Sequence, residues 1–156
     1  VYGYTDGLRT TITADVPGGG DQVTTYTYGT TKGVSAGDSE IATGHLLQKV
    51  AYPDSTGSSD TVTYAYDTQG RQDWMKDQSG NIIETTFDNA GREVSRAVTT
   101  LASGFNGDVR RIETSYTNRG QVENVTQYDA ASSGSIETRW STPTRATAAS
   151  SIFIRT

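Results

Sequence analysis

The chain of 156 residues carries 18 acidic residues against 13 Lys and Arg, for a formal net charge of −5, and it contains no cysteine. Basic residues this few and scattered do not form the positive patch that nucleic-acid binding needs. Without cysteine there is no disulfide, no thiolate nucleophile and no Cys-ligated metal site, and no apolar run approaches the ~20 residues that a membrane-spanning helix requires.

Side-chain composition favours an all-β fold with a thin core. Leu, Ile, Val and Phe together number 26, about a sixth of the chain, which is low for a globular protein. Disorder normally requires a high net charge as well, which this chain lacks. The 26 threonines and 9 tyrosines favour strands, and the 17 glycines supply turns.

The first third of the chain, residues 1–60, contains two weak copies of a short motif. The stretch "YTDGLR" begins at Tyr4, and the looser stretch "YTYGTTKG" runs from Tyr26 to Gly33. An insertion, "VSAGDSEIATG", follows the second copy. We therefore interpret residues 1–60 as degenerate repeats separated by insertions.

The middle of the chain, residues 61–130, repeats the motif clearly. The stretch "YDTQGR" at 66–71 returns as "FDNAGR" at 87–92, "YTNRGQ" at 116–121 is a partial copy, and a fourth copy opens at 128 and then loses its spacing. The motif residues are Tyr66, Asp67, Gly70 and Arg71, then Phe87, Asp88, Gly91 and Arg92, then Tyr116 and Gly120, and finally Tyr128 and Asp129.

Each copy of the motif predicts a β-hairpin. An Asp at the first turn position accepts backbone hydrogen bonds, and a Gly at the fourth position tolerates the positive φ that follows a type I turn. A second kind of turn, "DQSG" at 77–80, alternates with the first. The predicted fold is an antiparallel β-hairpin meander without long helices, with strands at roughly 61–66, 71–77, 81–87, 92–101, 108–116 and 121–128.

Alternation within these strands predicts one packed face and one solvent-facing face. Val62, Tyr64 and Tyr66 share one side, and Thr61, Thr63 and Ala65 share the other. A slip of one residue would turn every apolar side chain outward, so the repeated turn is interpreted as the device that sets the register. A single thin sheet is not expected to cover its own aromatic row, which also includes Phe87 and Tyr116.

The recurring Tyr-Asp-x-x-Gly-Arg pattern resembles the YD repeat of the RHS family, most specifically over residues 61–128. The resemblance implies a segment of a spiralling β-sheet shell. In relatives, such shells enclose a toxin segment or form a large extracellular body, which implies a secreted or cell-surface location. The RHS-associated core signature linked to self-cleavage in that family does not occur in this chain.

Two classes of function stay open, and an enzyme is a distant third. The first is a non-catalytic structural segment that builds β-sheet wall, with no cofactor. Its expected partners are further repeats of the same polypeptide or copies of itself, because unblocked strand edges recruit other strands, and an enclosed toxin segment or a carbohydrate is a further possibility. The second is a carbohydrate- or protein-binding module in which exposed tyrosines, with Trp74 and Trp140, stack on the ligand.

Individual motif residues also have two interpretations. Asp67, Asp88 and Asp129 either cap turns or supply carboxylates for catalysis or calcium, and the turn frame favours capping. Arg71 and Arg92 either bind an anionic ligand or, as we favour, pair with a turn aspartate or stack on an aromatic ring of the neighbouring hairpin.

The last part of the chain, residues 131–156, is interpreted as a Ser/Thr/Ala-rich tail or linker. From Ser141 onward it shows no turn motif. Its last apolar group, Ile152 to Ile154, is expected either to add an edge strand or to dock on a partner. The single histidine, His45, lacks the companions of a metal site or a catalytic triad and is expected at the surface.

Overall fold

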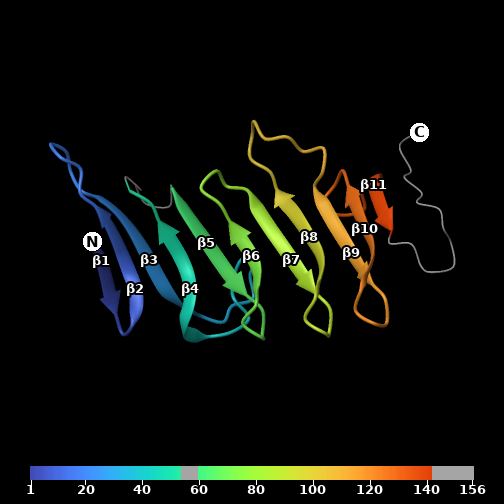
Figure 1. The fold of residues 1–156 in the computed structure, drawn as a ribbon, viewed down its shortest axis with the longest axis horizontal. Coiled ribbons are helices and arrows are strands. Elements are labelled where there is room, and N and C mark those ends of the chain that lie inside the picture. The colour runs from blue at the N-terminus through green and yellow to red at the C-terminus, as the bar shows by residue number, and fades with distance from the viewer. Residues whose placement is uncertain (54–59, 142–156) are drawn as a thin grey trace. The chain divides into compact units, whose positions relative to one another are not determined.

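The computed structural model describes residues 1–53 and 60–141. These residues form eleven strands and no helix, and the strands follow one another in the sheet in chain order, each antiparallel to the next (Figure 1). The predicted all-β antiparallel meander is therefore confirmed. The strands are β1 (Tyr2–Thr5), β2 (Leu8–Ala14), β3 (Gln22–Thr30), β4 (Thr43–Ala51), β5 (Thr61–Tyr66), β6 (Gln72–Lys76), β7 (Ile82–Phe87), β8 (Glu93–Thr100), β9 (Arg111–Tyr116), β10 (Val122–Tyr128) and β11 (Ile136–Ser141).

The six strands predicted between residues 61 and 128 all form, as β5 to β10. β9 begins at Arg111 rather than near 108 because the preceding loop is closed by Arg110, whose guanidinium donates to the carbonyl of Val98 at 2.9 and 2.6 Å. β1 to β4 form within 1–60, where the degenerate copies predicted hairpins without strand bounds. β11 forms where no strand was predicted, in the segment interpreted as a tail, and it pairs with β10. Residues 152–154 lie outside the described part of the chain.

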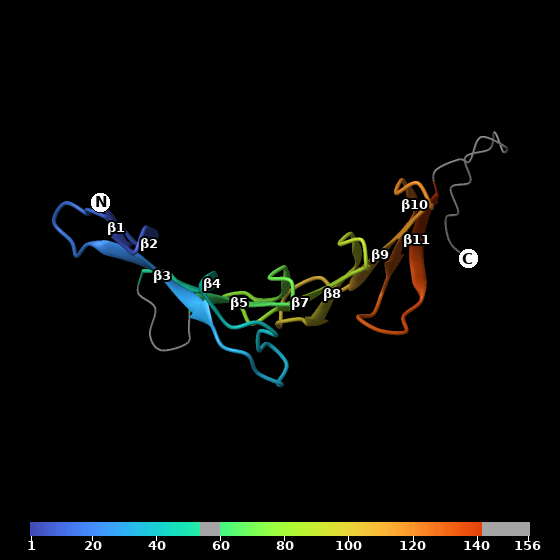
Figure 2. The same ribbon diagram turned by 90° about the horizontal axis from the view of Figure 1, so that it is seen from below.

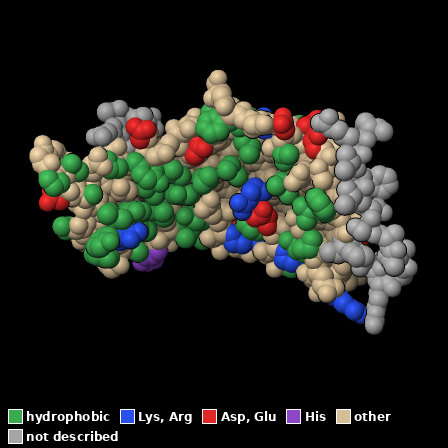
Figure 3. Space-filling view, turned by 45° about the horizontal axis from the view of Figure 1, so that its top comes forward, with side chains coloured by type: hydrophobic (Ala, Val, Ile, Leu, Met, Phe, Trp, Pro, Cys, Tyr) green, Lys and Arg blue, Asp and Glu red, His purple; other side chains and the backbone are tan. Residues whose placement is uncertain are grey.

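The chain folds as two compact units, 1–82 and 83–156. In the first unit the side chains of Tyr26, Val50 and Val62 lie on one face, because the register places Val50 opposite both Tyr26 and Val62. Figure 3 shows hydrophobic side chains gathered over the strands of this unit. Val50 is 5% exposed, so this face carries part of the core.

The other face of the first unit is covered as well, which corrects the expectation of one packed and one wet face. Ala65, predicted on the wet side, is only 1% exposed, and Thr61 on the same side is also buried. At Ala65 the cause is the loop 31–42 between β3 and β4, which lies on one side of the sheet near β5 (Figure 2). Gly37 of this loop packs against the indole of Trp74, the residue opposite Ala65.

The same loop also binds the backbone of Tyr66, the aromatic residue that ends β5. The backbone N–H of Tyr66 donates to Ser39 Oγ at 3.2 Å, and its carbonyl accepts from Glu40 N at 2.7 Å. Tyr66 is 8% exposed, so the expectation that the sheet leaves this ring uncovered is wrong. The loop thus fixes the backbone at the end of β5, and the hydroxyl of the Tyr66 ring binds the carbonyl of Leu47 on β4.

The second unit has an even thinner core. Ala97 of β8 and Thr126 of β10 are its buried residues among those described, and no large side chain of either unit is fully buried there. Because little apolar surface is removed from water, the fold depends strongly on the backbone ladders and on the turns that set them. The turns are therefore the part of the molecule in which the repeated residues act.

Candidate functional site: the repeated Asp–Gly–Arg turn

Four turns of the chain share one backbone geometry. In the turn 67–71, the N–H of Asp67 donates to the carbonyl of Arg71 at 2.9 Å, and the N–H of Gly70 donates back to the carbonyl of Asp67 at 3.0 Å. The turns 77–81, 88–92 and 117–121 make the same two bonds at 2.8 to 3.1 Å. All four predicted hairpin turns are thus confirmed.

The glycine of each turn occupies the left-handed region of backbone conformation. The φ angle is +76° at Gly70, +89° at Gly80, +80° at Gly91 and +80° at Gly120. A residue with a Cβ is strained at such an angle, and a β-branched residue most of all. The glycine of the motif is therefore required by the backbone.

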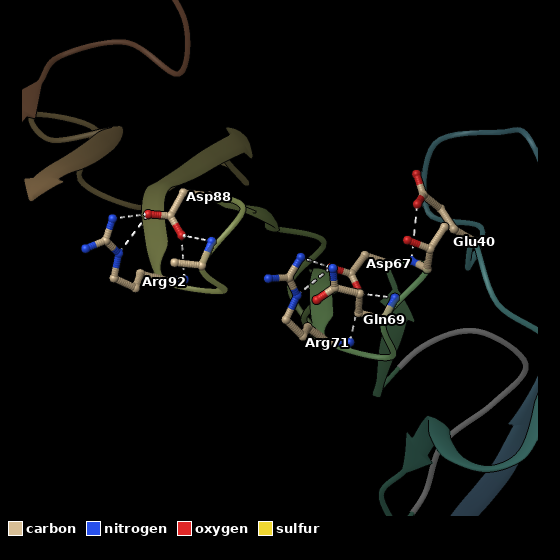
Figure 4. A network of polar contacts seen from close by, with 8 residues as sticks. Glu40, Asp67, Gln69, Arg71, Asp88 and Arg92 are labelled. Atoms are coloured by element: carbon tan, nitrogen blue, oxygen red, sulfur yellow. Dashed lines mark hydrogen bonds and ion pairs between the residues drawn. The ribbon is translucent and has the colours of Figure 1, made fainter. Parts of the chain in front are cut away.

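The aspartate of the motif uses both of its oxygens within its own turn. Oδ1 of Asp67 accepts from the N–H groups of Gln69 and Arg71 at 2.8 and 2.9 Å, while Oδ2 accepts from Arg71 Nε at 2.7 Å and pairs with Nη2 at 2.6 Å (Figure 4). Two nitrogens of the Arg71 guanidinium thus contact one oxygen of Asp67, and we call this arrangement the two-pronged Asp–Arg pair. The loop 31–42 adds Glu40, whose carboxylate accepts from Thr68 N at 3.3 Å.

The second full copy repeats this geometry within its own unit. Oδ1 of Asp88 accepts from Ala90 N and Arg92 N, both at 2.9 Å, and Oδ2 accepts from Arg92 Nε at 2.8 Å and pairs with Nη2 at 2.6 Å (Figure 4). Asp77, in the alternate turn, is held by Asn81 through its backbone N–H at 2.8 Å and its side-chain amide at 2.7 Å. Capping, and not an open carboxylate, is the role of these aspartates.

The electrostatics of the turns favour ionised carboxylates. For Asp88, the hydrogen bonds from the side chain and backbone of Arg92 hold the pKa below its ordinary value. For Asp67 and Asp77, burial alone would raise the pKa, but hydrogen bonds from Arg71 and Asn81 respectively outweigh it and lower the pKa. All three carboxylates are therefore stabilised as anions by their own turns.

The arginine of the second copy also contacts the next copy of the motif. The guanidinium carbon of Arg92 lies 4.3 Å from the ring centroid of Tyr116, and the Tyr116 hydroxyl donates to the carbonyl of Glu93 at 2.8 Å. Asp88 thus holds the Arg92 side chain, which lies over the Tyr116 ring. The carbonyl of Glu93, the residue after Arg92, accepts the hydrogen bond from the Tyr116 hydroxyl. Both readings favoured for Arg92, pairing and stacking, are confirmed together.

Two further aromatic residues of the motif are anchored by their hydroxyl groups. Tyr66 Oη donates to the carbonyl of Leu47 on the adjacent strand at 2.7 Å, and burial together with the nearby Tyr64 raises the pKa of Tyr66. Tyr128 Oη donates to Glu113 Oε2 at 3.0 Å, and Arg111 lies 4.1 Å over the Tyr128 ring. Each aromatic residue joins its strand to the preceding one, which sequence reasoning did not foresee.

The degenerate copies retain only parts of the arrangement. In 117–121, Thr117 Oγ1 accepts a single hydrogen bond from Gln121 N at 3.2 Å. Asp129 still caps a turn, but a longer one, through Ser135 N at 2.7 Å. Near the N-terminus, Asp6 and Gly7 form a two-residue turn with φ of +51° and +78°, whereas Gly33 lies inside the inserted loop.

The two tryptophans proposed to stack on a ligand are in different units and different surroundings. Trp74 of β6 is half-buried beneath Gly37, while Trp140 of β11 is 55% exposed opposite Val125. His45 is exposed, as expected. Within residues 1–53 and 60–141, no three His, Asp or Glu side chains cluster so as to hold a metal ion, and no helix there is long and apolar enough to span a membrane.

Comparison with known proteins gives no family for the chain. A scan against protein-family models found no match, and a search of curated protein sequences found none either.

Proposed function

We propose that the chain is a non-catalytic structural segment of a secreted or cell-surface protein with RHS-type YD repeats, and that its hairpins build β-sheet wall. The observation that carries the proposal is the use of the repeated residues. Both oxygens of Asp67 and of Asp88 are engaged within their own turns, and Arg92 is engaged by Asp88 and Tyr116. If a motif is repeated in order to build a sheet, its polar side chains are expected to have their hydrogen-bond partners within the sheet and its turns.

The wall has two expected kinds of partner, further repeats of the same polypeptide and copies of the chain itself. β1 and β11 are the first and last strands of the described order, so each has one neighbouring strand in that order. Ile136 and Trp140 of β11 are 54% and 55% exposed. A strand with unpaired N–H and C=O groups and exposed apolar side chains recruits another strand. Through such additions the sheet is proposed to enclose a cargo or to grow into a larger body.

The alternative, a carbohydrate- or protein-binding module, has support from exposed aromatic side chains, which are Trp140 and, in the first unit, Tyr2, Tyr4 and Tyr52. The Trp140 indole is 55% exposed, while the Trp74 indole is packed against Gly37. A pull-down with immobilised polysaccharides separates the two functions. A wall segment retains no more chain than the bare resin does, and a binding module is retained and is released by the Trp140→Ala substitution.

Light scattering on the isolated 156-residue chain tests the wall proposal directly. We expect association at micromolar concentration that increases with concentration, because β1 and β11 each have one neighbouring strand among the described residues. A monodisperse monomer that unfolds cooperatively across the same concentration range would contradict the proposal.

A further inference from the structure

The inserted loop 31–42 and the sheet of the first unit line an open groove that the wall function does not use. Its volume is about 410 Å³, within the size range of small-molecule sites. The loop contributes Thr31, Ala36 and Ser39, and the strands contribute Lys49, Thr63 and Trp74 among others. Ser39 is only 5% exposed, and its hydroxyl accepts from the backbone of Tyr66, so this wall of the groove is fixed in place.

Strand register places Lys76, which does not line the groove itself, on the same face of the sheet as Lys49, which does. Thr63 of β5 is opposite Lys49 of β4 on one side and opposite Lys76 of β6 on the other. Residues directly opposite in an antiparallel ladder share a face, and Trp74 shares it with Lys76 because they are two positions apart on one strand. Lys49, Thr63 and Lys76 thus form a row across three strands with the indole beside it.

Within the described part of the chain, neither Lys49 nor Lys76 forms an ion pair. The acidic side chain that lines the groove, Asp38, is engaged by its own loop through a bond from Ser35 N at 2.8 Å. The chain as a whole is acidic, with a net charge of −5, so a local pair of cations is needed to hold an anion on it.

We propose that this groove binds a small organic acid. The acid group lies at the lysine row, where the ammonium groups of Lys49 and Lys76 balance its charge and the Thr63 hydroxyl donates to it. The planar or apolar part of the ligand lies against the exposed part of the Trp74 indole beneath the loop. This ligand site is separate from the Asp–Gly–Arg turns and independent of the wall function.

Tryptophan fluorescence measures the binding directly. The chain has two tryptophans, so the Trp140→Phe variant leaves Trp74 as the only reporter. The probes are benzoate and phenyl phosphate, which represent carboxylate and phosphate ligands, and neutral benzamide. We expect both anions to change the Trp74 emission saturably and in a salt-sensitive way, and benzamide to bind more weakly than either. The tighter of the two anions identifies the preferred acid group.

Charge variants in the same Trp140→Phe background test the role of the lysines. Lys49→Gln and Lys76→Gln are each expected to weaken anion binding by about fivefold. Lys49→Arg keeps the charge and retains binding, and Arg119→Gln removes one positive charge from the other unit without effect. If the Lys49→Gln variant loses the circular dichroism spectrum of the folded chain, the Lys76→Gln variant tests the site, because the Lys76 side chain is exposed. Benzamide binding as tightly as benzoate, no saturation with either anion, or unchanged binding in Lys76→Gln would each overturn the site.

Discussion

The turns 88–92 and 117–121 lie in the same unit and have the same backbone, but they differ in what their side chains do. The bond from the first residue's N–H to the fifth residue's carbonyl is 2.9 Å in one and 2.8 Å in the other, and the glycine φ is +80° in both. Asp88 accepts four contacts from Ala90 and Arg92, whereas Thr117 accepts one hydrogen bond.

The difference separates two roles within one motif. Glycine and the backbone are sufficient to form the turn, since the degenerate copy forms it without Asp or Arg. The Asp–Arg pair adds a link to the next strand, because Arg92, once held by Asp88, lies over Tyr116. A repeat can therefore lose its acidic and basic residues and keep its hairpin, but it then loses the arginine–aromatic contact between hairpins.

Acid is expected to have the broadest effect, because it acts on every aspartate turn at once. The pKa of Asp67, Asp77 and Asp88 is lowered by folding, so their contribution to stability is present above the unfolded value near ~3.9 and is lost as pH falls through the lower folded values. The urea midpoint should be level from about pH 7 to 5 and fall below about pH 4. An unchanged or higher midpoint at acidic pH would contradict this.

Valine in place of the turn glycine is expected to be the most damaging single substitution. Gly91→Val and Gly120→Val should each lower the free energy of unfolding by about 1–3 kcal/mol, because both glycines have the same positive φ. Urea denaturation measures both. A cost at Gly91 alone would show that the two turns do not share a backbone requirement.

Alanine at the first turn position is expected to distinguish the two turns. Asp88→Ala removes four contacts and Thr117→Ala removes one, so the fall in urea midpoint should be roughly twice as large or more for Asp88. Equal falls would mean that the Asp–Arg pair contributes nothing beyond the backbone turn. Asp88→Asn, which keeps an acceptor oxygen, serves as the intermediate case.

The smallest effect is expected from the hydroxyl of Tyr116. Tyr116→Phe should cost about 0.5–1.5 kcal/mol, because the half-buried carbonyl of Glu93 loses its donor while the ring stays over Arg92. Tyr116→Leu removes the ring contact as well and should cost more. If the two variants unfold at the same urea concentration, the ring contact contributes nothing to stability.

The sequence predicted the hairpins well because their signals are local. Asp at the first position and Gly at the fourth determine a turn within five residues, so β5 to β10 and their four turns could be placed without knowledge of distant contacts. The bond between the Arg and Asp side chains was predictable for the same reason. Strand β11 was missed because Asp129 closes a longer turn with an altered spacing.

Other features depend on contacts that spacing does not encode. Tyr66 lies opposite Gln72 and Ala65 lies opposite Trp74, so Asp73 is an extra residue in β6. Glu123 is the corresponding extra residue in β10. These bulges shift the alternation that was assumed to be regular. Likewise, the burial of Ala65 results from a loop that leaves the sheet some 30 positions earlier in the chain and returns over it.

The central claim is that the repeated Asp and Arg are structural devices, and building the device into the degenerate turn tests it most directly. The variant Thr117→Asp/Gln121→Arg should recreate the two-pronged pair and raise the free energy of unfolding by about 0.5–1.5 kcal/mol in urea denaturation. Thr117→Asp/Gln121→Lys supplies the same charges without the planar fork and should gain less. A chain no more stable than the parent, or equally stabilised by Lys, would contradict the account.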